Sequence, residues 1–258
     1  MKIVSNNYDD KNIATMELIY GEGYLSAGGA EEVAGIFDGV DVEGKDILDI
    51  GCGLGGAAVA LAKNHKAGKV YAIDVEESVL ARARNLVARE SLGNQIKLIL
   101  VEPGDLQFPD RSFDIVHITA VACHFQNLKP LFSEILRVLK PGGVIVGRDW
   151  FKLNASDEFQ NWDRLLRDKG LNFYFVMVDV FQRALIDVGF DNVSMTDRSE
   201  DMAELARNAV KSVDLELKDK LVTILGREGY EDCRRWTKIR ARALTNGGIG
   251  QFHFTGYQ

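Results

Sequence analysis

Residues 47–56 read Ile-Leu-Asp-Ile-Gly-Cys-Gly-Leu-Gly-Gly, an apolar strand that runs into a glycine-rich turn. Glycines at 51 and 53 let the backbone turn sharply and approach a ligand closely, because a Cβ would stand in the way. The next expected strand ends in Asp74, where a carboxylate can accept hydrogen bonds from both hydroxyls of a ribose. The stretch therefore predicts a nucleoside-binding site at the carboxyl ends of parallel strands.

Apolar runs alternate with amphipathic segments on both sides of that stretch, as in an α/β protein. We expect strands at Asp46–Ile50, Lys69–Asp74, Ile96–Val101, Phe113–Ile118 and Val144–Asp149, and helices at Leu54–Asn64, Glu77–Glu90 and Leu128–Leu139. From residue 154 the sequence becomes helix-rich, with helices at Asp179–Val188 and within Asp201–Leu225, a strand at Asn192–Thr196 and an antiparallel edge strand at Gln251–Tyr257. This order predicts a mainly parallel seven-stranded sheet with helices on both faces.

The chain contains no Pro/Gly/Ser-rich linker, internal repeat or low-complexity segment. We therefore expect one domain over residues 1–258, organised in three parts. Residues 1–40 form an N-terminal lid and helix, residues 41–153 form the cofactor-binding core, and residues 154–258 form cap helices and the final strands.

Composition and charge narrow the class of protein. Hydrophobic residues make up 46% of the chain and charged residues 27%, which is typical of a soluble globular protein. The formal net charge of -7 argues against nucleic acid as a partner, because phosphate backbones are bound by Lys and Arg. No apolar stretch approaches the roughly 20 residues of a membrane helix. Residues 1–7 lack the apolar centre of a secretory signal.

The cysteines and histidines predict neither disulfides nor a metal site. Cys52, Cys123 and Cys233 are widely spaced and odd in number, which favours free thiols and a cytoplasmic location. The four histidines form no pair at the helical spacing that metal sites use. We expect no metal, no membrane and no nucleic acid as partners, and the oligomeric state stays open.

The glycines at 51, 53 and 56 also fit the G-x-G-x-x-G pattern of dinucleotide-binding enzymes. Asp49 argues against that reading, because its carboxylate would repel a pyrophosphate and attract an ammonium. Asp105, after the third strand, can accept a hydrogen bond from an adenine amino group. Residues 139–143, Leu-Lys-Pro-Gly-Gly, lead into the fifth strand. With these elements together, the sequence resembles the class I methyltransferases over about residues 20–150.

That resemblance implies a Rossmann-like class I methyltransferase fold that binds S-adenosyl-L-methionine. Asp49 is expected at the ammonium of its methionine end, Asp74 at the ribose and Asp105 at the adenine. The full set of expected cofactor contacts is Tyr8, Leu25, Ser26, Asp49, Gly51, Gly53, Asp74, Val75, Gly104, Asp105, Leu106 and Thr119.

Ahead of the first strand, residues 19–29 read Ile-Tyr-Gly-Glu-Gly-Tyr-Leu-Ser-Ala-Gly-Gly, which is too rich in glycine for a packed helix. This segment is similar to the lid of the phosphoethanolamine N-methyltransferases of plants, nematodes and protozoa. The resemblance implies that Tyr8 and His124 form a catalytic latch over the acceptor. It also implies that Lys238 binds a substrate phosphate.

The acceptor pocket departs from that family. Where the family has an aspartate four residues before the histidine, this chain has Ala120, and Trp150 replaces a tyrosine. The family's arginine and tyrosine beyond the fifth strand fall on Leu171 and Phe173. The changes remove charge and add aromatic surface. The expected contacts of the small-molecule acceptor are Tyr20, Ala120, His124, Trp150, Phe173 and Lys238.

Two enzyme functions follow from these features. The lid with Tyr8 and His124 favours an amine N-methyltransferase acting on a small molecule. Ala120 and the aromatic cap keep open the alternative of a C- or O-methyltransferase of an apolar or prenyl-type intermediate. A non-catalytic binder is disfavoured, because it would not need the intact aspartates and glycines of the cofactor site.

Overall fold

The computed structural model describes residues 8–258, so the expectation about residues 1–7 lies outside the described part. Seven strands form one sheet in the order β3-β2-β1-β4-β5-β7-β6. The first five strands along the chain pair in parallel, and β7 is antiparallel to both of its neighbours. Their bounds are β1 Asp46–Ile50, β2 Lys69–Asp74, β3 Ile96–Leu100, β4 Phe113–Thr119, β5 Leu139–Lys152, β6 Asp191–Asp197 and β7 Ile249–Tyr257.

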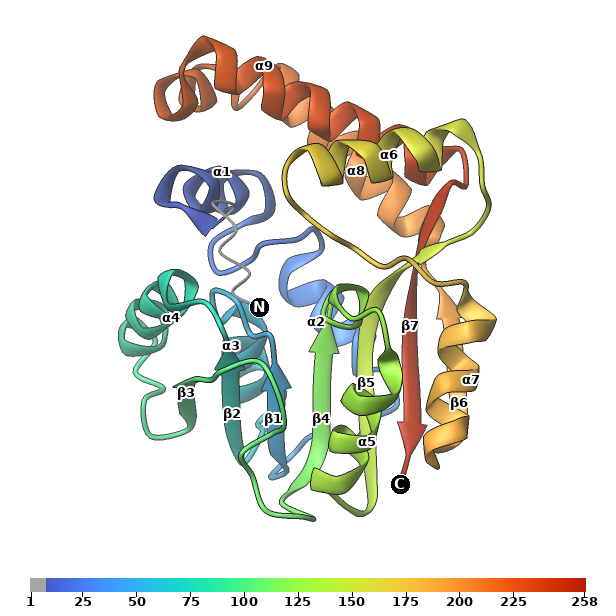
Figure 1. Cartoon of the computed structure of the whole chain (residues 1–258). Helices are drawn as coiled ribbons and strands as arrows, with labels where there is room; N and C mark the ends of the chain where they lie inside the picture. Colours follow the sequence, from blue (N-terminus) through green and yellow to red (C-terminus); the bar gives the residue numbers. More distant parts are fainter. Residues whose placement is uncertain (1–7) are drawn as a thin grey trace.

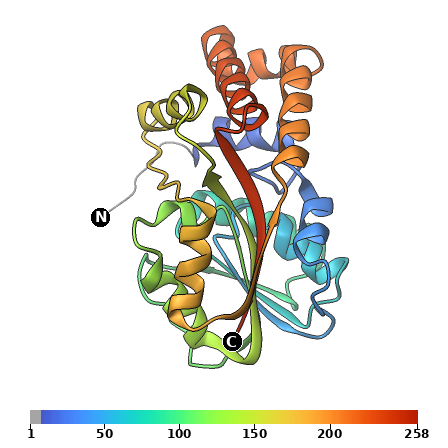
Figure 2. The same ribbon diagram turned by 90° about the vertical axis from the view of Figure 1, so that its right-hand side faces the viewer.

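Helices cover both faces of this sheet, as the alternating sequence pattern predicts. Helices α2 (Gly29–Ile36), α3 (Gly56–Lys63) and α4 (Glu77–Arg89) contribute side chains to one core layer. Helices α5 (Leu128–Val138) and α7 (Val178–Val188) contribute to the other. Figure 2 shows the sheet between the two sets. The expected α/β class and mainly parallel sheet are confirmed.

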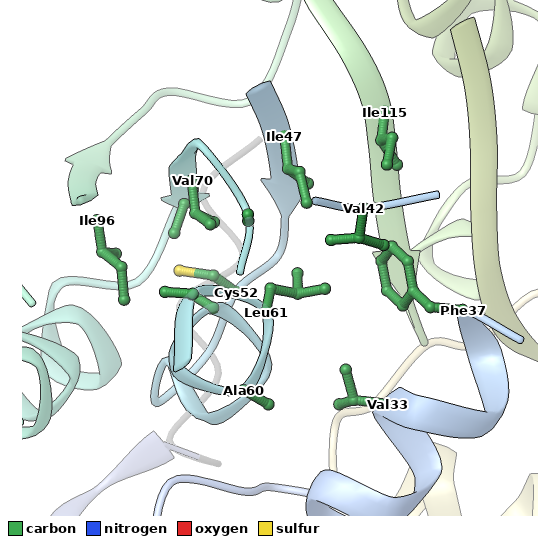
Figure 3. Packing of buried hydrophobic residues seen from close by; sticks show 14 of the residues in the cluster. Val33, Phe37, Val42, Ile47, Cys52, Ala60, Leu61, Val70, Ile96 and Ile115 are labelled. Carbon is green, nitrogen blue, oxygen red and sulfur yellow. The ribbon is translucent and has the colours of Figure 1, made fainter. Parts of the chain in front are cut away.

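The first core layer fills the space between the sheet and α2 and α3 (Figure 3). Ile47 of β1 and Ile115 of β4 point toward Leu61 of α3, and Phe37 closes the layer beside α2. These side chains are at most 3% exposed, so the layer is dry and rigid. It fixes the end of β1 and the start of α3, between which the glycine-rich turn lies.

A second group of helices lies at the end of the sheet toward which β4 points (Figure 1). It comprises α6 (Asp157–Asp168), α8 (Ser199–Asp214) and α9 (Lys218–Thr245), with α1 (Asp10–Tyr20) in contact with α8 and α9. The amphipathic stretch Asp201–Leu225 falls on two helices, and α9 breaks at Gly226, which has φ 75°. This cap covers the carboxyl ends of the parallel strands, where ligands of such sheets bind.

The expectation that Gln251–Tyr257 is an edge strand is wrong. Strand β7 lies between β5 and β6 and pairs with β5 from Ile249 to Tyr257. The alternation of polar and apolar residues suggested one solvated face. In fact Gln251 and His253 are buried, and the His253 ring is 2.7 Å from a carboxylate oxygen of Glu32. Polar residues that are buried in β7 thus give the same alternating sequence pattern as a strand with one solvent-exposed face.

Several element boundaries differ from the expected ones by a few residues, and two of these differences have a clear structural cause. Helix α3 begins at Gly56 and not at Leu54, because Gly55 has φ 84° and still belongs to the turn. Strand β5 begins at Leu139, so the Pro-Gly-Gly segment lies within the strand as an irregularity, where Gly142 has φ 75° and the pairing with β4 shifts between Phe113 and Ile115.

Other features of the described residues bear on class and location. Cys52, Cys123 and Cys233 are free thiols. Residues 8–258 contain no helix that is both long and apolar enough to cross a membrane. Within the same range, no cluster of His, Cys, Asp or Glu is arranged to hold a metal ion.

Candidate active site

The glycine-rich turn joins β1 to α3 under the N-terminal segment. Gly51 has φ 71° and Gly53 has φ 54°, a region that favours glycine. The Gly51 N–H donates to the Ile73 carbonyl at 2.8 Å, which ties the turn to β2. A Cβ on Gly51 would lie 2.5 Å from a methyl of Val121. A Cβ on Gly53 would lie 3.1 Å from a methyl of Leu25, so both glycines keep this space free.

Asp74 is held at the end of β2 by backbone donors. Its Oδ2 accepts from the Gly53 N–H at 2.8 Å and its Oδ1 from the Glu76 N–H at 3.0 Å. Burial raises the pKa of Asp74, although these hydrogen bonds partly lower it. A carboxylate offers about four lone-pair positions, so acceptor capacity remains for another donor group. Position and free capacity fit the two hydroxyls of a ribose, as expected from the sequence.

Asp49 has one satisfied and one unsatisfied oxygen. Its Oδ1 is 2.7 Å from Nδ1 of His117, whose Nε2 is 2.9 Å from the Thr119 hydroxyl. Its Oδ2 is buried and has no hydrogen-bond partner among the described residues. An unsatisfied buried carboxylate oxygen is costly, so an added donor is favoured there. The ammonium of a methionine group fits this need.

The residues expected around the adenine lie on the surface beside β2 and β3. Val75 is 48% exposed and Asp105 is also exposed, with no side-chain hydrogen bond among residues 8–258. Leu106 follows, and its N–H donates to a carboxylate oxygen of Glu134 at 2.9 Å. Gly104 precedes Asp105 in the same loop. The exposed Asp105 carboxylate is thus accessible to the amino group of an adenine, and this role stays a prediction.

The lid lies over the glycine-rich turn and is fastened at several points. The Tyr24 hydroxyl donates to the Gly56 carbonyl at 3.2 Å. Arg148, at 2% exposure in β5, donates to the Ser26 hydroxyl at 2.7 Å and to the Ala27 carbonyl at 3.1 Å. The sequence reading missed Arg148. A basic residue at the end of the apolar run Val144–Gly147 was the available signal, because buried arginines are almost always paired.

Tyr8 packs in a small apolar cluster with Leu25 of the lid, Leu54 of the glycine-rich turn and Val79 of α4. Burial, and to a smaller extent the nearby Asp74 carboxylate, raises the pKa of its hydroxyl to about 12. The hydroxyl is therefore protonated at neutral pH and can donate. Among residues 8–258, no hydrogen bond joins Tyr8 to His124, so the latch between them stays a prediction.

His124 ends a short 3₁₀ turn, η2 (Ala122–His124), directly after β4. Asp149 fixes this turn, because its Oδ2 accepts from the N–H groups of Ala122 at 2.8 Å and Cys123 at 3.4 Å. Burial lowers the pKa of His124, so its imidazole is neutral at physiological pH. The Phe173 ring meets it edge-on with centroids 4.6 Å apart. His124 is thus a fixed, neutral imidazole beside an aromatic wall.

The remaining expected acceptor contacts divide into two groups. Ala120 sits at the carboxyl end of β4 with φ 55°, and its N–H donates to the Arg148 carbonyl. Trp150 and Phe173 pack into one cluster under α6 and α9. Lys238 lies elsewhere: its Nζ is 2.8 Å from Asp214 Oδ2 in an ion pair. The structure brings the aromatic residues together and gives Lys238 a partner of its own.

Comparison with known proteins agrees with this geometry. Residues 48–147 match the family described as a methyltransferase domain. This part of the chain is therefore similar to a methyltransferase domain. The match begins in β1, before the glycine-rich turn, and ends in β5, so it covers the turn, Asp74, Asp105 and His124. The expected resemblance to class I methyltransferases is confirmed.

Curated relatives and a solved structure extend the likeness beyond that domain. Phosphoethanolamine N-methyltransferase 3 of Arabidopsis thaliana is 26% identical over 87% of this chain and 45% of the relative. The Plasmodium falciparum enzyme of that name is 28% identical over 76% of this chain and 73% of the relative. Phosphoethanolamine N-methyltransferase 2 of Haemonchus contortus, solved with phosphomonomethylethanolamine and S-adenosylhomocysteine, superposes with TM-score 0.88 at 21% identity.

That superposition covers 98% of this chain and 58% of the Haemonchus chain. At this identity it shows the fold: a Rossmann-like class I methyltransferase sheet with its cap. The chain spans about half the length of the Arabidopsis relative that it matches.

Proposed function

We propose that this protein is an S-adenosyl-L-methionine-dependent methyltransferase that acts on a small-molecule amine. The observation that carries the proposal is the pair of carboxylates beside the glycine-rich turn. Asp74 is hydrogen-bonded to the turn at Gly53 and keeps acceptor capacity for another donor, and Asp49 keeps a buried oxygen without a donor among the described residues. The relatives named as amine methyltransferases support the same reading.

The cofactor's residues follow from that geometry. Asp49 would hold the ammonium, Asp74 the ribose hydroxyls, and Val75 with Asp105 the adenine. Gly51, Gly53 and the lid residues Leu25 and Ser26 would surround the methionine end. When bound, the sulfonium supplies an electrophilic methyl group, which leaves to the protein the tasks of alignment and proton removal.

His124 can remove the proton. An amine is nucleophilic only in its neutral form, and a buried neutral imidazole beside the acceptor accepts the proton that methylation releases. The fastened lid excludes water, which holds the reactants in line. Ala120 offers no carboxylate to an acceptor ammonium, so we propose that Trp150 and Phe173 provide an aromatic wall instead. On that basis phosphoethanolamine should be a poor substrate.

Three further points belong to this proposal. Residues 1–258 act as one methyltransferase domain, with the matched residues 48–147 inside the expected core. The free thiols are in keeping with a cytoplasmic location. The partner is a small-molecule acceptor and not nucleic acid, which agrees with the net charge of -7.

The test is methyl transfer itself. The protein should bind S-adenosyl-L-methionine and its demethylated product by calorimetry, and Asp74→Ala should weaken both by about 1–3 kcal/mol, because buried donors lose their partner. A mass-spectrometric screen for added methyl groups across amines, amino acids, phenols and prenyl compounds identifies the acceptor. Binding of NAD in place of S-adenosyl-L-methionine would refute the proposal. Methylation at carbon or oxygen would keep the enzyme class and replace the acceptor.

A further inference from the structure

His117 is a buried polar side chain that the proposed methyl transfer does not use. It lies in β4 and is 1% exposed. In the parallel pairing of β1 with β4, His117 is the partner of Asp49, so the two side chains emerge on the same face of the sheet. Thr119 follows two residues later in the same strand and therefore shares that face. The register of the sheet thus places a carboxylate, an imidazole and a hydroxyl in one row.

Both nitrogen atoms of the His117 ring have hydrogen-bond partners. Nδ1 lies 2.7 Å from Asp49 Oδ1, and because an ionised carboxylate only accepts, Nδ1 carries a proton and donates it. Nε2 lies 2.9 Å from the Thr119 hydroxyl, which can donate or accept and so satisfies this nitrogen. Rotation of the ring would break both hydrogen bonds in the protein interior, where an unpaired polar group is costly. His117 is therefore a fixed donor to Asp49.

Packing also restrains the His117 ring. The Phe37 ring lies against it, with centroids 5.3 Å apart and an interplanar angle of 43°. Phe37 is itself 3% exposed and belongs to the core layer between the sheet and helices α2 and α3. A side chain that is held by both packing and hydrogen bonds can keep a neighbouring functional group in a single orientation.

The consequence of this arrangement falls on the two oxygens of Asp49. Oδ1 accepts from His117, whereas Oδ2 is buried and has no hydrogen-bond partner among residues 8–258. Burial, and to a smaller extent the charge of Asp49, raises the pKa of Asp74, so the two carboxylates lie within electrostatic reach of each other. A cationic donor at Asp49 Oδ2 would satisfy this oxygen and reduce the repulsion between the two carboxylates.

We propose that His117 is a positioning residue for the cofactor. Its Nδ1–H holds Oδ1 of Asp49 and thereby presents Oδ2 to the ammonium of the methionine end, while Thr119 fixes the other side of the ring. The inference rests on the proposed function, since the ammonium belongs to S-adenosyl-L-methionine. His117 acts through Asp49, so its removal should weaken ligands that carry this ammonium and spare ligands that lack it.

The experiment compares two ligands that differ only in the amino group. S-Adenosylhomocysteine carries it, and the deaminated analogue keeps the adenosine, the thioether and the carboxylate. Calorimetry on the full-length protein measures both affinities. His117→Leu removes both ring nitrogens and should weaken S-adenosylhomocysteine binding about tenfold or more, because a buried carboxylate oxygen loses its donor. Binding of the deaminated analogue should stay within about twofold of wild type.

Rescue distinguishes positioning from a general loss of stability. Asparagine can place an amide N–H near the position of Nδ1, so His117→Asn should bind S-adenosylhomocysteine within about threefold of wild type. Thr119→Val keeps the shape of the side chain but removes the hydroxyl, and it should weaken S-adenosylhomocysteine alone by about threefold. Asp74→Ala is the matched control, because both ligands carry the ribose and should lose affinity about equally.

Equal losses for the two ligands in His117→Leu would overturn the proposal, and so would wild-type affinity for S-adenosylhomocysteine in that variant. If His117→Leu does not fold, Thr119→Val decides the question in the same way, because Thr119 is only half-buried. A wild-type protein that binds neither ligand would refute the proposed function itself. Binding of both ligands without the expected difference would overturn this inference alone.

Discussion

The cofactor half and the acceptor half of the site are built in different ways. The cofactor half consists of short stretches, residues 49–56 and 74–76, whose polar groups are fixed by nearby backbone. The acceptor half joins distant segments: Asp149 accepts from the N–H of Ala122, 27 residues away, the Phe173 ring meets His124, and Tyr20 of α1 lies against Arg240 of α9. The first half is therefore a local motif, and the second exists only in the folded chain.

The largest effect that separates the halves is expected for His124→Ala. Loss of the proton acceptor should lower kcat by about 10²–10⁴-fold, the usual contribution of general-base catalysis. Affinity for S-adenosylhomocysteine should stay within twofold, because His124 belongs to the acceptor half. Because burial lowers the pKa of His124, wild-type kcat should fall only below the ordinary histidine range, and the variant should lack this limb. Turnover on the identified acceptor and calorimetry check both statements.

Tyr8→Phe is the partner variant for the latch. It keeps the aromatic ring packed on Leu54 and Val79 and removes only the hydroxyl. If the hydroxyl closes on His124 during turnover, kcat should fall while cofactor affinity holds. Wild-type turnover in both variants would rule the latch out.

Gly51→Ala should affect the cofactor half instead. The added Cβ would lie 2.5 Å from Val121, and φ 71° costs a non-glycine residue about 1–2 kcal/mol. The turn must shift, so affinity for S-adenosylhomocysteine should fall at least tenfold. Gly39→Ala is the matched control, because Gly39 has φ 76° and no atom within 4 Å of the added Cβ. Equal losses of affinity in both variants would show that backbone strain alone lowers the affinity and that the space beside Gly51 is not needed for cofactor binding.

The same contrast explains what could be predicted from the sequence. The parallel strands and the turn follow from hydrophobic periodicity and from Gly51 and Gly53, and they are confirmed. The prediction that β7 is an edge strand was wrong. Gln251 and His253 have polar side chains, and their burial depends on segments that are distant in the sequence. The environment of Arg240 could not be predicted, since sequence spacing does not show that Tyr20, far away in the chain, stacks on it.

Asp149 holds the turn that carries His124, and the pH dependence of stability tests this role. Burial raises its pKa to about 6, although hydrogen bonds from Trp150, Cys123 and Ala122 partly lower it. The folded state therefore favours the protonated carboxyl. This contribution to stability is present below the unfolded value near 3.9 and is lost as pH rises through about 6.

Asp149→Asn removes this titration. The free energy of unfolding of wild type minus that of the variant should fall by about 2–3 kcal/mol between pH 4 and pH 7, the equivalent of a pKa difference of about two units. Urea denaturation at several pH values measures it. Parallel stability curves for the two proteins would contradict the assignment.

The smallest effect is expected for Lys238→Gln, and it tests the comparison most directly. Lys238 and Arg234 both pair with Asp214, and the Arg234 Nε lies 2.6 Å from that carboxylate. The Lys238 side chain is 35% exposed. Ion pairs of this exposure contribute about 0–1 kcal/mol, so the variant should unfold less than about 1 kcal/mol more easily and bind anions as wild type does. The resemblance to the phosphoethanolamine enzymes makes the opposite prediction, since it assigns Lys238 to the substrate phosphate. If Lys238→Gln weakens the binding of inorganic phosphate tenfold, the ion pair with Asp214 opens for the ligand. The acceptor half would then follow the family motif, and its anion site would have been predictable from the sequence after all.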